Sequence, residues 1–203
     1  ADLTAPEGGF YTARDADSEG EEGTYYVWTP EQLEKVLGKH DAEFALNTFG
    51  LIADGDMAGK VIVNLDNVSG QSLPQVDRIL ARLAEARKPR PKPVRDQKIL
   101  ANWNGMMIAS TAQAAILLDD AHYRDAAIRA AEFIWTRMRD EAGTLHRSHF
   151  EGSNAIEGEL DDYAHMARAY LFVHDATGDQ LWLERASTLL EQMNRHFQDP
   201  RTG

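Results

Sequence analysis

The second half of the chain contains four long stretches in which hydrophobic residues recur with a helical period. Segments 102–118 and 160–177 are apolar on nearly every side, whereas 121–139 and 179–197 are apolar on one side only. A helix that is apolar all round is enclosed by protein, and a helix with a single apolar stripe turns its other side to water. The sequence therefore predicts four helices in the order inner, outer, inner, outer.

The segments that join these helices alternate between short and long. Asp119-Asp120 and Gly178-Asp179 lead from an inner to an outer helix, whereas 140–159 leads from an outer helix to the next inner one. Gly178 suits the left-handed position that follows a helix. This alternation predicts an all-α fold, a partial (α/α)6 toroid in which the long loops and the inner-helix N-termini share one face, where a pocket would form. A solenoid of helix pairs is the competing architecture, which the irregular loops and weak self-similarity disfavour.

The first part of the chain is richer in loops. Short strands are predicted near 9–13 and 24–28, on either side of an acidic loop, and a further one at VIVNL in a Gly- and Asp-rich segment. Helices are predicted at 30–38, 41–49 and 72–87, the first of them with Thr29 as N-cap and Pro30 at its first position. Arg87 to Pro93, RKPRPKP, is typical of a stiff connector.

We therefore treat 1–203 as a fragment of one toroid domain with two sub-parts. Residues 1–95 form a loop-rich hairpin region, and 96–203 form two inner/outer helix pairs. We expect more than half of the residues to be helical, with at most three short strands. Both termini fall at a repeat boundary, so the sequence supplies about half a ring, and apolar surface at the open edges should lead the fragment to self-associate.

Composition narrows the classes of partner. The net charge is −12, which gives nucleic acid and anionic membrane surfaces no basic field to bind. There are no cysteines, hence no disulfide or thiolate metal site. No stretch is apolar enough to span a membrane and the N-terminus does not resemble a signal peptide, so we expect a cytoplasmic protein. The Asp15-x-Asp17-x-Glu19 opening imitates a calcium loop, but Tyr26 occupies the position that requires a bidentate Glu, and we expect neither metal nor cofactor.

Three motifs carry a family resemblance: GGFYTARDADSEGEEGTYYVWTPEQLEKVLG, KILANWNGMMIAS and ELDDYAHMARAYL. With these the chain resembles the middle part of the YyaL / spermatogenesis-associated protein 20 family. The resemblance implies an N-terminal thioredoxin-like domain elsewhere in the full-length protein. It also implies a six-hairpin toroid similar to N-acylglucosamine 2-epimerases and several glycosidases.

Candidate catalytic groups are carboxylates and a histidine expected near the pocket face. Asp161 and Asp162 open an inner helix, where one Asp suffices as a cap and the other can point across the mouth. Asp15 and Asp17 directly follow the aromatic GGFY segment, and most acids of that loop are expected to be solvated. His146 could act as acid or base if its loop folds over the pocket, although an exposed loop histidine is the commoner case. His146 and His149 should face opposite sides of a strand, so we do not expect them to share a metal.

Candidate substrate-binding groups are aromatic rings and an amide: Trp103, Asn104, Tyr163 and Tyr11. A ring can cover the apolar face of a sugar while an amide binds its hydroxyls, though Trp103 is more often a core residue. Asn102 is a natural helix cap, and Gly105 inside a helix predicts close approach of a neighbouring helix or a ligand. We expect Asp15, Asp162, Trp103 and Tyr163 to converge on one face.

Two functions remain open from the sequence. The first is a carbohydrate-processing toroid, a sugar isomerase, epimerase or glycosidase-like enzyme with acid–base groups at the inner-helix mouth. The second is a non-catalytic module that binds a glycan or client protein for the thioredoxin-like domain. A carboxyl pair with one strongly raised pKa in a deep pocket would favour the first function.

Overall fold

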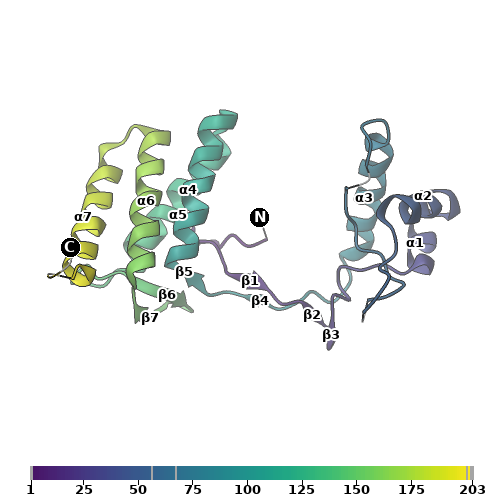
Figure 1. Cartoon of the computed structure of the whole chain (residues 1–203), viewed down its shortest axis with the longest axis horizontal. Coiled ribbons are helices and arrows are strands. Elements are labelled where there is room, and N and C mark those ends of the chain that lie inside the picture. Colours follow the sequence, from purple (N-terminus) through teal and green to yellow (C-terminus); the bar gives the residue numbers. More distant parts are fainter. Residues whose placement is uncertain (1, 56, 67, 200, 202–203) are drawn as a thin grey trace. The chain divides into compact units, whose positions relative to one another are not determined.

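The computed structural model describes residues 2–55, 57–66, 68–199 and 201. The chain forms two compact units, each described here by itself. The helix-pair unit comprises Ala1–Ala13 and Arg95–Gly203, and the loop-rich unit comprises Arg14–Val94 (Figure 1). Residues 1–13, which the sequence analysis assigned to the loop-rich part, thus belong with the helix pairs. Slightly more than half of the residues are helical, as predicted.

The helix-pair unit contains four long helices that begin and end within two residues of the predicted positions. These helices are α4 (Ala101–Leu118), α5 (Ala121–Arg137), α6 (Leu160–Thr177) and α7 (Gln180–Phe197). The two helices predicted to be inner, α4 and α6, pack along each other, α5 packs on α4, and α7 packs on α6 (Figure 1). This pairing agrees with the predicted order of the helices in two pairs. None of the helices in the described part of the chain is long and apolar enough to cross a membrane.

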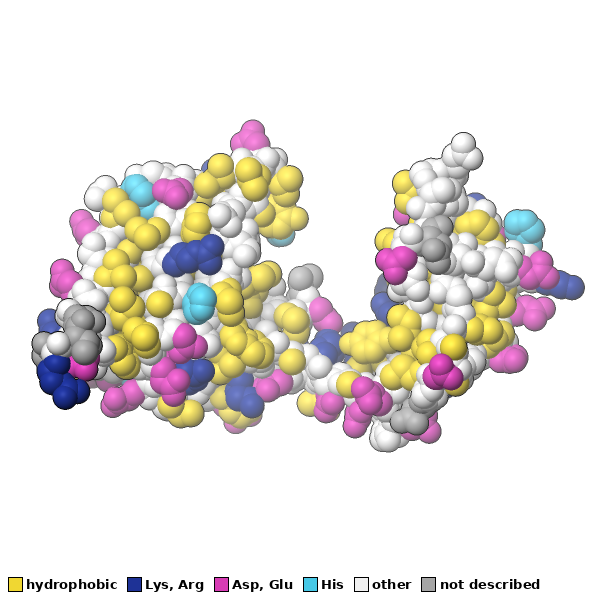
Figure 2. Space-filling model, viewed as in Figure 1, with side chains coloured by type: hydrophobic (Ala, Val, Ile, Leu, Met, Phe, Trp, Pro, Cys, Tyr) yellow, Lys and Arg dark blue, Asp and Glu magenta, His cyan; other side chains and the backbone are white. Residues whose placement is uncertain are grey.

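One side of α4 lies open to solvent although its residues are apolar. Trp103, Met107 and Leu117 are exposed at helical spacing along this side, together with Met106. Figure 2 shows hydrophobic side chains spread over the surface of this unit. The prediction of an inner helix enclosed on every side therefore holds only for the faces of α4 that α5 and α6 cover.

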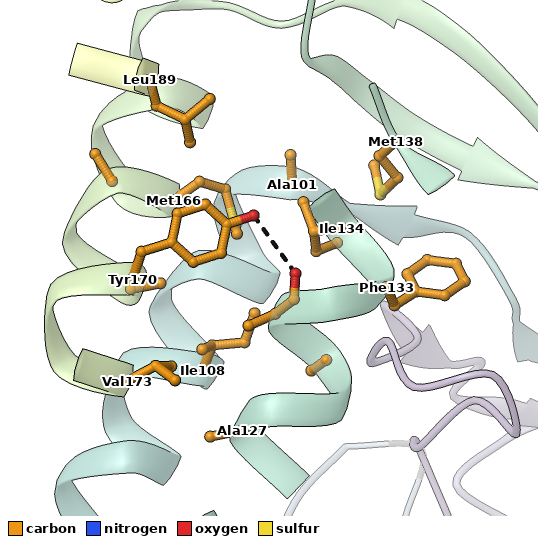
Figure 3. Close-up of a cluster of buried hydrophobic side chains, with 14 of the residues drawn as sticks. Ala101, Ile108, Ala127, Phe133, Ile134, Met138, Met166, Tyr170, Val173 and Leu189 are labelled. Carbon is orange, nitrogen blue, oxygen red and sulfur yellow. Dashed lines mark hydrogen bonds between the residues drawn. The ribbon is translucent and has the colours of Figure 1, made fainter. Parts of the chain in front are cut away.

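The core between the helices is continuous and tightly packed. Met166, Tyr170 and Val173 of α6 meet Ile108 of α4 and Ile134 of α5, all without measurable exposure (Figure 3). The Tyr170 hydroxyl donates to the Ala131 carbonyl over 3.4 Å, which satisfies a buried polar group.

Both inner-to-outer connections use the same turn chemistry. Asp119 (φ 50°) and Gly178 (φ 72°) end α4 and α6 in the left-handed conformation. The next residue in each case caps the following helix: Asp120 accepts from the His122 N–H, and Asp179 from the Leu181 N–H. These tight turns place the N-termini of α4 and α6 at the other end of the helix pairs.

That other end carries a three-stranded antiparallel sheet. Its strands are β5 (Ile99–Leu100), β6 (His146–Phe150) and β7 (Ser153–Glu157), with Ile99 opposite His149. β6 and β7 are formed by the long outer-to-inner connector. Side chains at every second position along this segment face the helices: Leu145 is buried, Arg147 contacts the start of α6, and His149 packs on Phe133 of α5.

The N-terminal GGFY segment is docked onto this unit by a buried amide. Asn104 of α4 accepts from the Phe10 N–H through Oδ1 (2.7 Å) and donates to the carbonyls of Phe10 and Leu100 through Nδ2 (both 2.9 Å). A Cβ on Gly8 would lie 2.5 Å from the Arg129 carbonyl oxygen, so this close approach requires glycine.

The loop-rich unit contains α1 (Pro30–Leu37), α2 (Lys39–Phe49) and α3 (Leu73–Arg87), close to the predicted ranges. Thr29 and Gln32 form the capping box that starts α1, as the sequence indicated. Asp41 of α2 accepts hydrogen bonds from Gln75 and Arg78 of α3, which joins these two helices.

The strand predictions for the first part were wrong. Strands 9–13 and 24–28 do not form as predicted, and Trp28 makes only an isolated bridge to Val61 of the VIVNL segment. The acidic segment itself turns back as β2 (Asp17–Ser18) and β3 (Glu21–Glu22), helped by positive φ at Glu19 and Gly20. β1 (Ala13–Arg14) and β4 (Arg95–Asp96) lie where the chain passes between the units. The described residues therefore contain more strands than the three that we expected at most. The additional strands are short polar segments of neighbouring loops that pair with one another.

Candidate functional site

The first turns of α4 and α6 are joined by direct hydrogen bonds. Asp162 accepts from the Asn102 N–H through Oδ1 (3.0 Å), and the Asn102 side-chain amide donates to Asp161 Oδ2 (2.7 Å). The two inner-helix N-termini thus lie at one end, as the loop alternation predicted. We call Asn102, Trp103, Arg147, Glu159, Asp161 and Asp162 the inner-helix mouth.

Arg147 of β6 binds three carboxylates at the start of α6. One of its terminal nitrogens (Nη1) lies 2.8 Å from Glu159 Oε2, 3.2 Å from Asp161 Oδ1 and 3.1 Å from Asp162 Oδ2. Sequence analysis did not single out Arg147, because a lone arginine in a polar connector looks like ordinary surface charge. The alternation Leu145, Arg147, His149 is the signal that would have placed it on the helix-facing side of a strand.

Asp162 is a positioning residue in this arrangement. Its side chain is fully buried, and its Oδ2 also accepts from the Glu159 N–H (2.9 Å) in a capping box. Burial raises the pKa of Asp162, against the opposing effects of the Glu159 hydrogen bond and the Arg147 charge. Glu159, and neither of the two predicted aspartates, is the N-cap of α6.

Asp161 is the reachable carboxylate of the pair. Its side chain is 44% exposed. Burial tends to raise the pKa of Asp161, but the Asn102 hydrogen bond and the Arg147 charge outweigh it, so the pKa lies below its usual value. The pKa values of the two neighbouring carboxyls are therefore shifted in opposite directions, and Asp161 is ionised at neutral pH.

Trp103 projects into solvent at the same helix start. It is 49% exposed, so the core role that is commoner for tryptophan does not apply. Its backbone N–H donates to Asn102 Oδ1 (2.8 Å), so the Asn102 side chain is bonded to the Trp103 backbone and to the Asp161 side chain. Asn102 is not the helix cap that we expected, because α4 begins one residue earlier, after Leu100.

Two predicted sugar-binding residues have structural roles instead. Tyr163 is 1% exposed, and its hydroxyl accepts from the Leu145 N–H over 3.1 Å. Asn104 is equally buried and holds the Phe10 backbone, as described above. Both side chains are thus buried and hydrogen-bonded to backbone groups.

The remaining predicted residues are not among those that form the inner-helix mouth. His146 points to the side of β6 opposite Arg147, with Nε2 3.7 Å from Asp140 Oδ2. Tyr11 stacks under the Arg95 guanidinium and lines a separate cleft in the helix-pair unit. Asp15 and Asp17 belong to the loop-rich unit, where both are exposed and Asp15 accepts from the Asp17 N–H. Within the described residues there is no cluster of three or more His, Asp or Glu side chains that could hold a metal ion.

Solved structures of similar shape show the fold class. A sugar epimerase from a ruminal bacterium matches 99% of this chain and 52% of its own chain, with a TM-score of 0.50 and 14% sequence identity. At this identity the likeness concerns the fold alone. It agrees with the partial (α/α)6 toroid predicted from helix patterning.

Sequence comparison gives closer relatives. No family model matches the chain. Human spermatogenesis-associated protein 20 is 30% identical and its mouse counterpart 29% identical, each over 99% of this chain and 31% of the relative. The chain thus spans about a third of the length of the curated relatives it matches. This match confirms the resemblance predicted from the three motifs: the chain is related to spermatogenesis-associated protein 20 over nearly its whole length.

Proposed function

We propose that this chain is a carbohydrate-binding part of a toroid, with its binding site at the inner-helix mouth. The observation that carries the proposal is the pairing of an exposed ring with an exposed, ionised carboxylate. The Trp103 and Asp161 side chains are both reachable from solvent, and the Asn102 side chain is hydrogen-bonded to the Trp103 backbone N–H and to the Asp161 carboxylate.

The chemistry of these groups suits a sugar. The Trp103 ring offers an apolar face for the C–H side of a pyranose. Asp161 retains lone pairs for sugar hydroxyls, and Arg147 and Asn102 hold its carboxylate in one orientation. A site fixed in this way loses little side-chain entropy on binding.

Sugar isomerase, epimerase or glycosidase-like chemistry is the second candidate. The opposite pKa shifts of Asp161 and Asp162 favour it, because acid–base catalysis uses two groups whose environments push their pKa values apart. However, Asp162 is fully buried and both of its oxygens accept hydrogen bonds. Binding without catalysis, on behalf of a thioredoxin-like domain in the full-length protein, therefore has the stronger support.

Tryptophan fluorescence offers a direct test of the proposed site. Trp28 and Trp182 are 3% exposed and Trp135 is only partly exposed, so acrylamide should quench Trp103 most strongly. We expect a neutral oligosaccharide that binds the mouth to protect Trp103 from quenching. Trp103→Phe should abolish the protection signal, and Asp161→Asn should weaken binding about tenfold, the value of one charge-assisted hydrogen bond.

Asp125→Asn is the matched control for the charge change. Asp125 lies on α5, outside the mouth, and its substitution should leave protection unchanged. If a panel of neutral mono- and oligosaccharides gives no protection, or if protection survives Asp161→Asn at full strength, the proposed site is wrong. Turnover of any sugar in the panel that is lost in Asp162→Asn would instead favour the catalytic candidate.

A further inference from the structure

A cleft lies in the helix-pair unit, lined by none of the residues of the inner-helix mouth. Its volume is about 490 Å³, within the range of ordinary small-molecule sites. Ile99, Phe133 and Tyr11 supply its apolar lining, and Glu7, Glu151 and His149 are among its polar residues. These residues come from the docked GGFY segment, β5, α5 and the β6–β7 hairpin, so four separate elements build the cleft.

The hydrogen bonds around His149 fix which of its ring nitrogens carries the proton. Asn154 donates from Nδ2 to the Arg137 carbonyl (2.8 Å), which turns its Oδ1 toward His149 Nδ1 at 2.7 Å. An amide oxygen can only accept, so Nδ1 of His149 must be the donor. In the neutral ring Nε2 is then an acceptor, and no hydrogen bond from a described residue occupies it.

The ring of His149 is also held in place from the side. It meets the Phe133 ring edge-on, with the centroids 5.3 Å apart and the planes at 86°. Asn154 and Phe133 together leave the imidazole little freedom to turn. A histidine oriented by an amide, with one bare nitrogen in a cleft, is the arrangement that proteins use to accept a proton or hydrogen bond from a ligand.

The charges of the lining limit the class of ligand. Glu7 and Glu151 outnumber Arg137, the only cationic side chain among the lining residues, so an anion is disfavoured. The described residues offer no three-ligand metal cluster here. Hydrogen-bond acceptors therefore predominate around an aromatic and aliphatic floor, which complements a neutral ligand rich in hydroxyl donors.

We propose that this cleft binds a neutral monosaccharide or polyol, with His149 Nε2 accepting a hydroxyl hydrogen bond and Glu7 and Glu151 accepting others. The ring face of the ligand packs on Phe133 and Tyr11. This site is independent of the inner-helix mouth and does not rest on the function proposed for it.

Imidazole NMR of the full 203-residue chain tests the proposal in two steps. In the free protein, long-range ¹H–¹⁵N spectra should show His149 as the Nδ1–H tautomer. Titration with N-acetylglucosamine, glucose and myo-inositol should then shift the His149 Nε2 signal, whereas glucuronate should not. A free-protein Nε2–H tautomer would overturn the assignment, as would the absence of any shift with all three neutral probes.

Variants separate this cleft from the mouth. His149→Phe keeps a ring against Phe133 but removes the hydrogen-bond acceptor. Glu151→Gln changes an exposed residue outside the core. Each variant should weaken ligand binding about tenfold, as measured by calorimetry. Glu141→Gln, an exposed charge change outside the cleft, should leave the affinity unchanged. Undiminished affinity in both cleft variants would refute the site. Trp103 quenching reports only on the mouth, so either site can fail while the other stands.

Discussion

Gly105 of α4 lies directly against the backbone of His165 in α6. A Cβ at Gly105 would lie 2.6 Å from the His165 carbonyl carbon and 2.8 Å from its oxygen, closer than real contacts allow. The sequence predicted a close approach at this glycine without saying whether a helix or a ligand makes it. The structure shows that the inner helix α6 does, and this contact sets how near the two inner helices come below the mouth.

Gly105→Ala should destabilise the helix-pair unit. Alanine gains about 1 kcal/mol of helix propensity over glycine. Overpacking against backbone that cannot move aside costs about 1–3 kcal/mol, so we expect a net loss of up to about 2 kcal/mol. Urea unfolding measures it. Gly70→Ala is the matched control, because a Cβ there meets nothing within 4 Å and its φ is not positive; a Gly105→Ala protein as stable as this control would contradict the close contact.

Arg147→Met should destabilise the start of α6. The substitution leaves the buried Asp162 carboxylate beside Asp161 and Glu159 without the cation that contacts all three. Breaking a buried ion pair costs about 3–5 kcal/mol, and because Arg147 is partly exposed we expect about 2–3 kcal/mol. Arg129→Met, an exposed change on α5, should cost far less.

The double variant Arg147→Met/Asp162→Asn checks the reason for that loss. Asparagine carries no charge, so it removes the electrostatic penalty that Arg147→Met creates at Asp162. The double variant should therefore recover part of the lost free energy of unfolding. Strictly additive losses in the double-mutant cycle would show that Arg147 and Asp162 do not interact as described.

Asp41 should make the loop-rich unit sensitive to acid. The Gln75 hydrogen bond is the main cause that lowers the pKa of Asp41; burial opposes it, and His40 and Arg78 assist it. A carboxyl whose folded pKa is below its unfolded value of about 4 stabilises the protein above that pH. This stabilisation by Asp41 begins to be lost as the pH falls below about 4, the unfolded pKa, and is fully lost once the pH is below the folded pKa.

Asp41→Asn should therefore lower the melting temperature at pH 7 and flatten its decline below about pH 4. Melting curves followed by circular dichroism between neutral pH and pH 3 measure both effects. Asp77→Asn, an exposed change on α3, removes the same charge and serves as the control. An acid profile for Asp41→Asn that parallels the wild-type profile would argue against this linkage.

Sequence patterning predicted the helices well because their cause is local. The apolar period of α4 to α7, the capping box of Thr29 and the left-handed Gly178 are all legible within a few residues. The site was harder to predict, because its contacts join distant segments. The sequence predicts Asn104 as a sugar-binding amide, but its hydrogen-bond partner Phe10 lies 94 residues away along the chain.

The separation of contacting residues along the chain also explains which residues of the inner-helix mouth could be predicted from the sequence. Asp161 and Trp103 were predicted because Asp at a helix start and Trp beside amides are recognisable motifs. Tyr163 is predicted to bind a sugar, but its hydroxyl accepts a hydrogen bond from the Leu145 N–H of the connector. No local sequence pattern encodes this contact. Strand alternation around Arg147 could be recognised only once the connector was known to form a sheet.

The exposed side of α4 should drive self-association in solution. Met106, Met107 and Leu117 lie on this side, and Leu117 is 82% exposed. Apolar surface of this extent on one helix is usually covered by another protein surface, because leaving it in water forgoes about 25 cal/mol for each Å².

We expect sedimentation velocity at micromolar concentration to show species larger than a monomer. The double variant Met107→Glu/Leu117→Glu should shift the distribution toward monomer, whereas Val94→Glu, at an exposed position of the loop-rich unit, should not. A wild-type chain that sediments as a clean monomer and binds no dye for apolar surface would mean that this side of α4 is tolerated in water and that the predicted self-association is wrong.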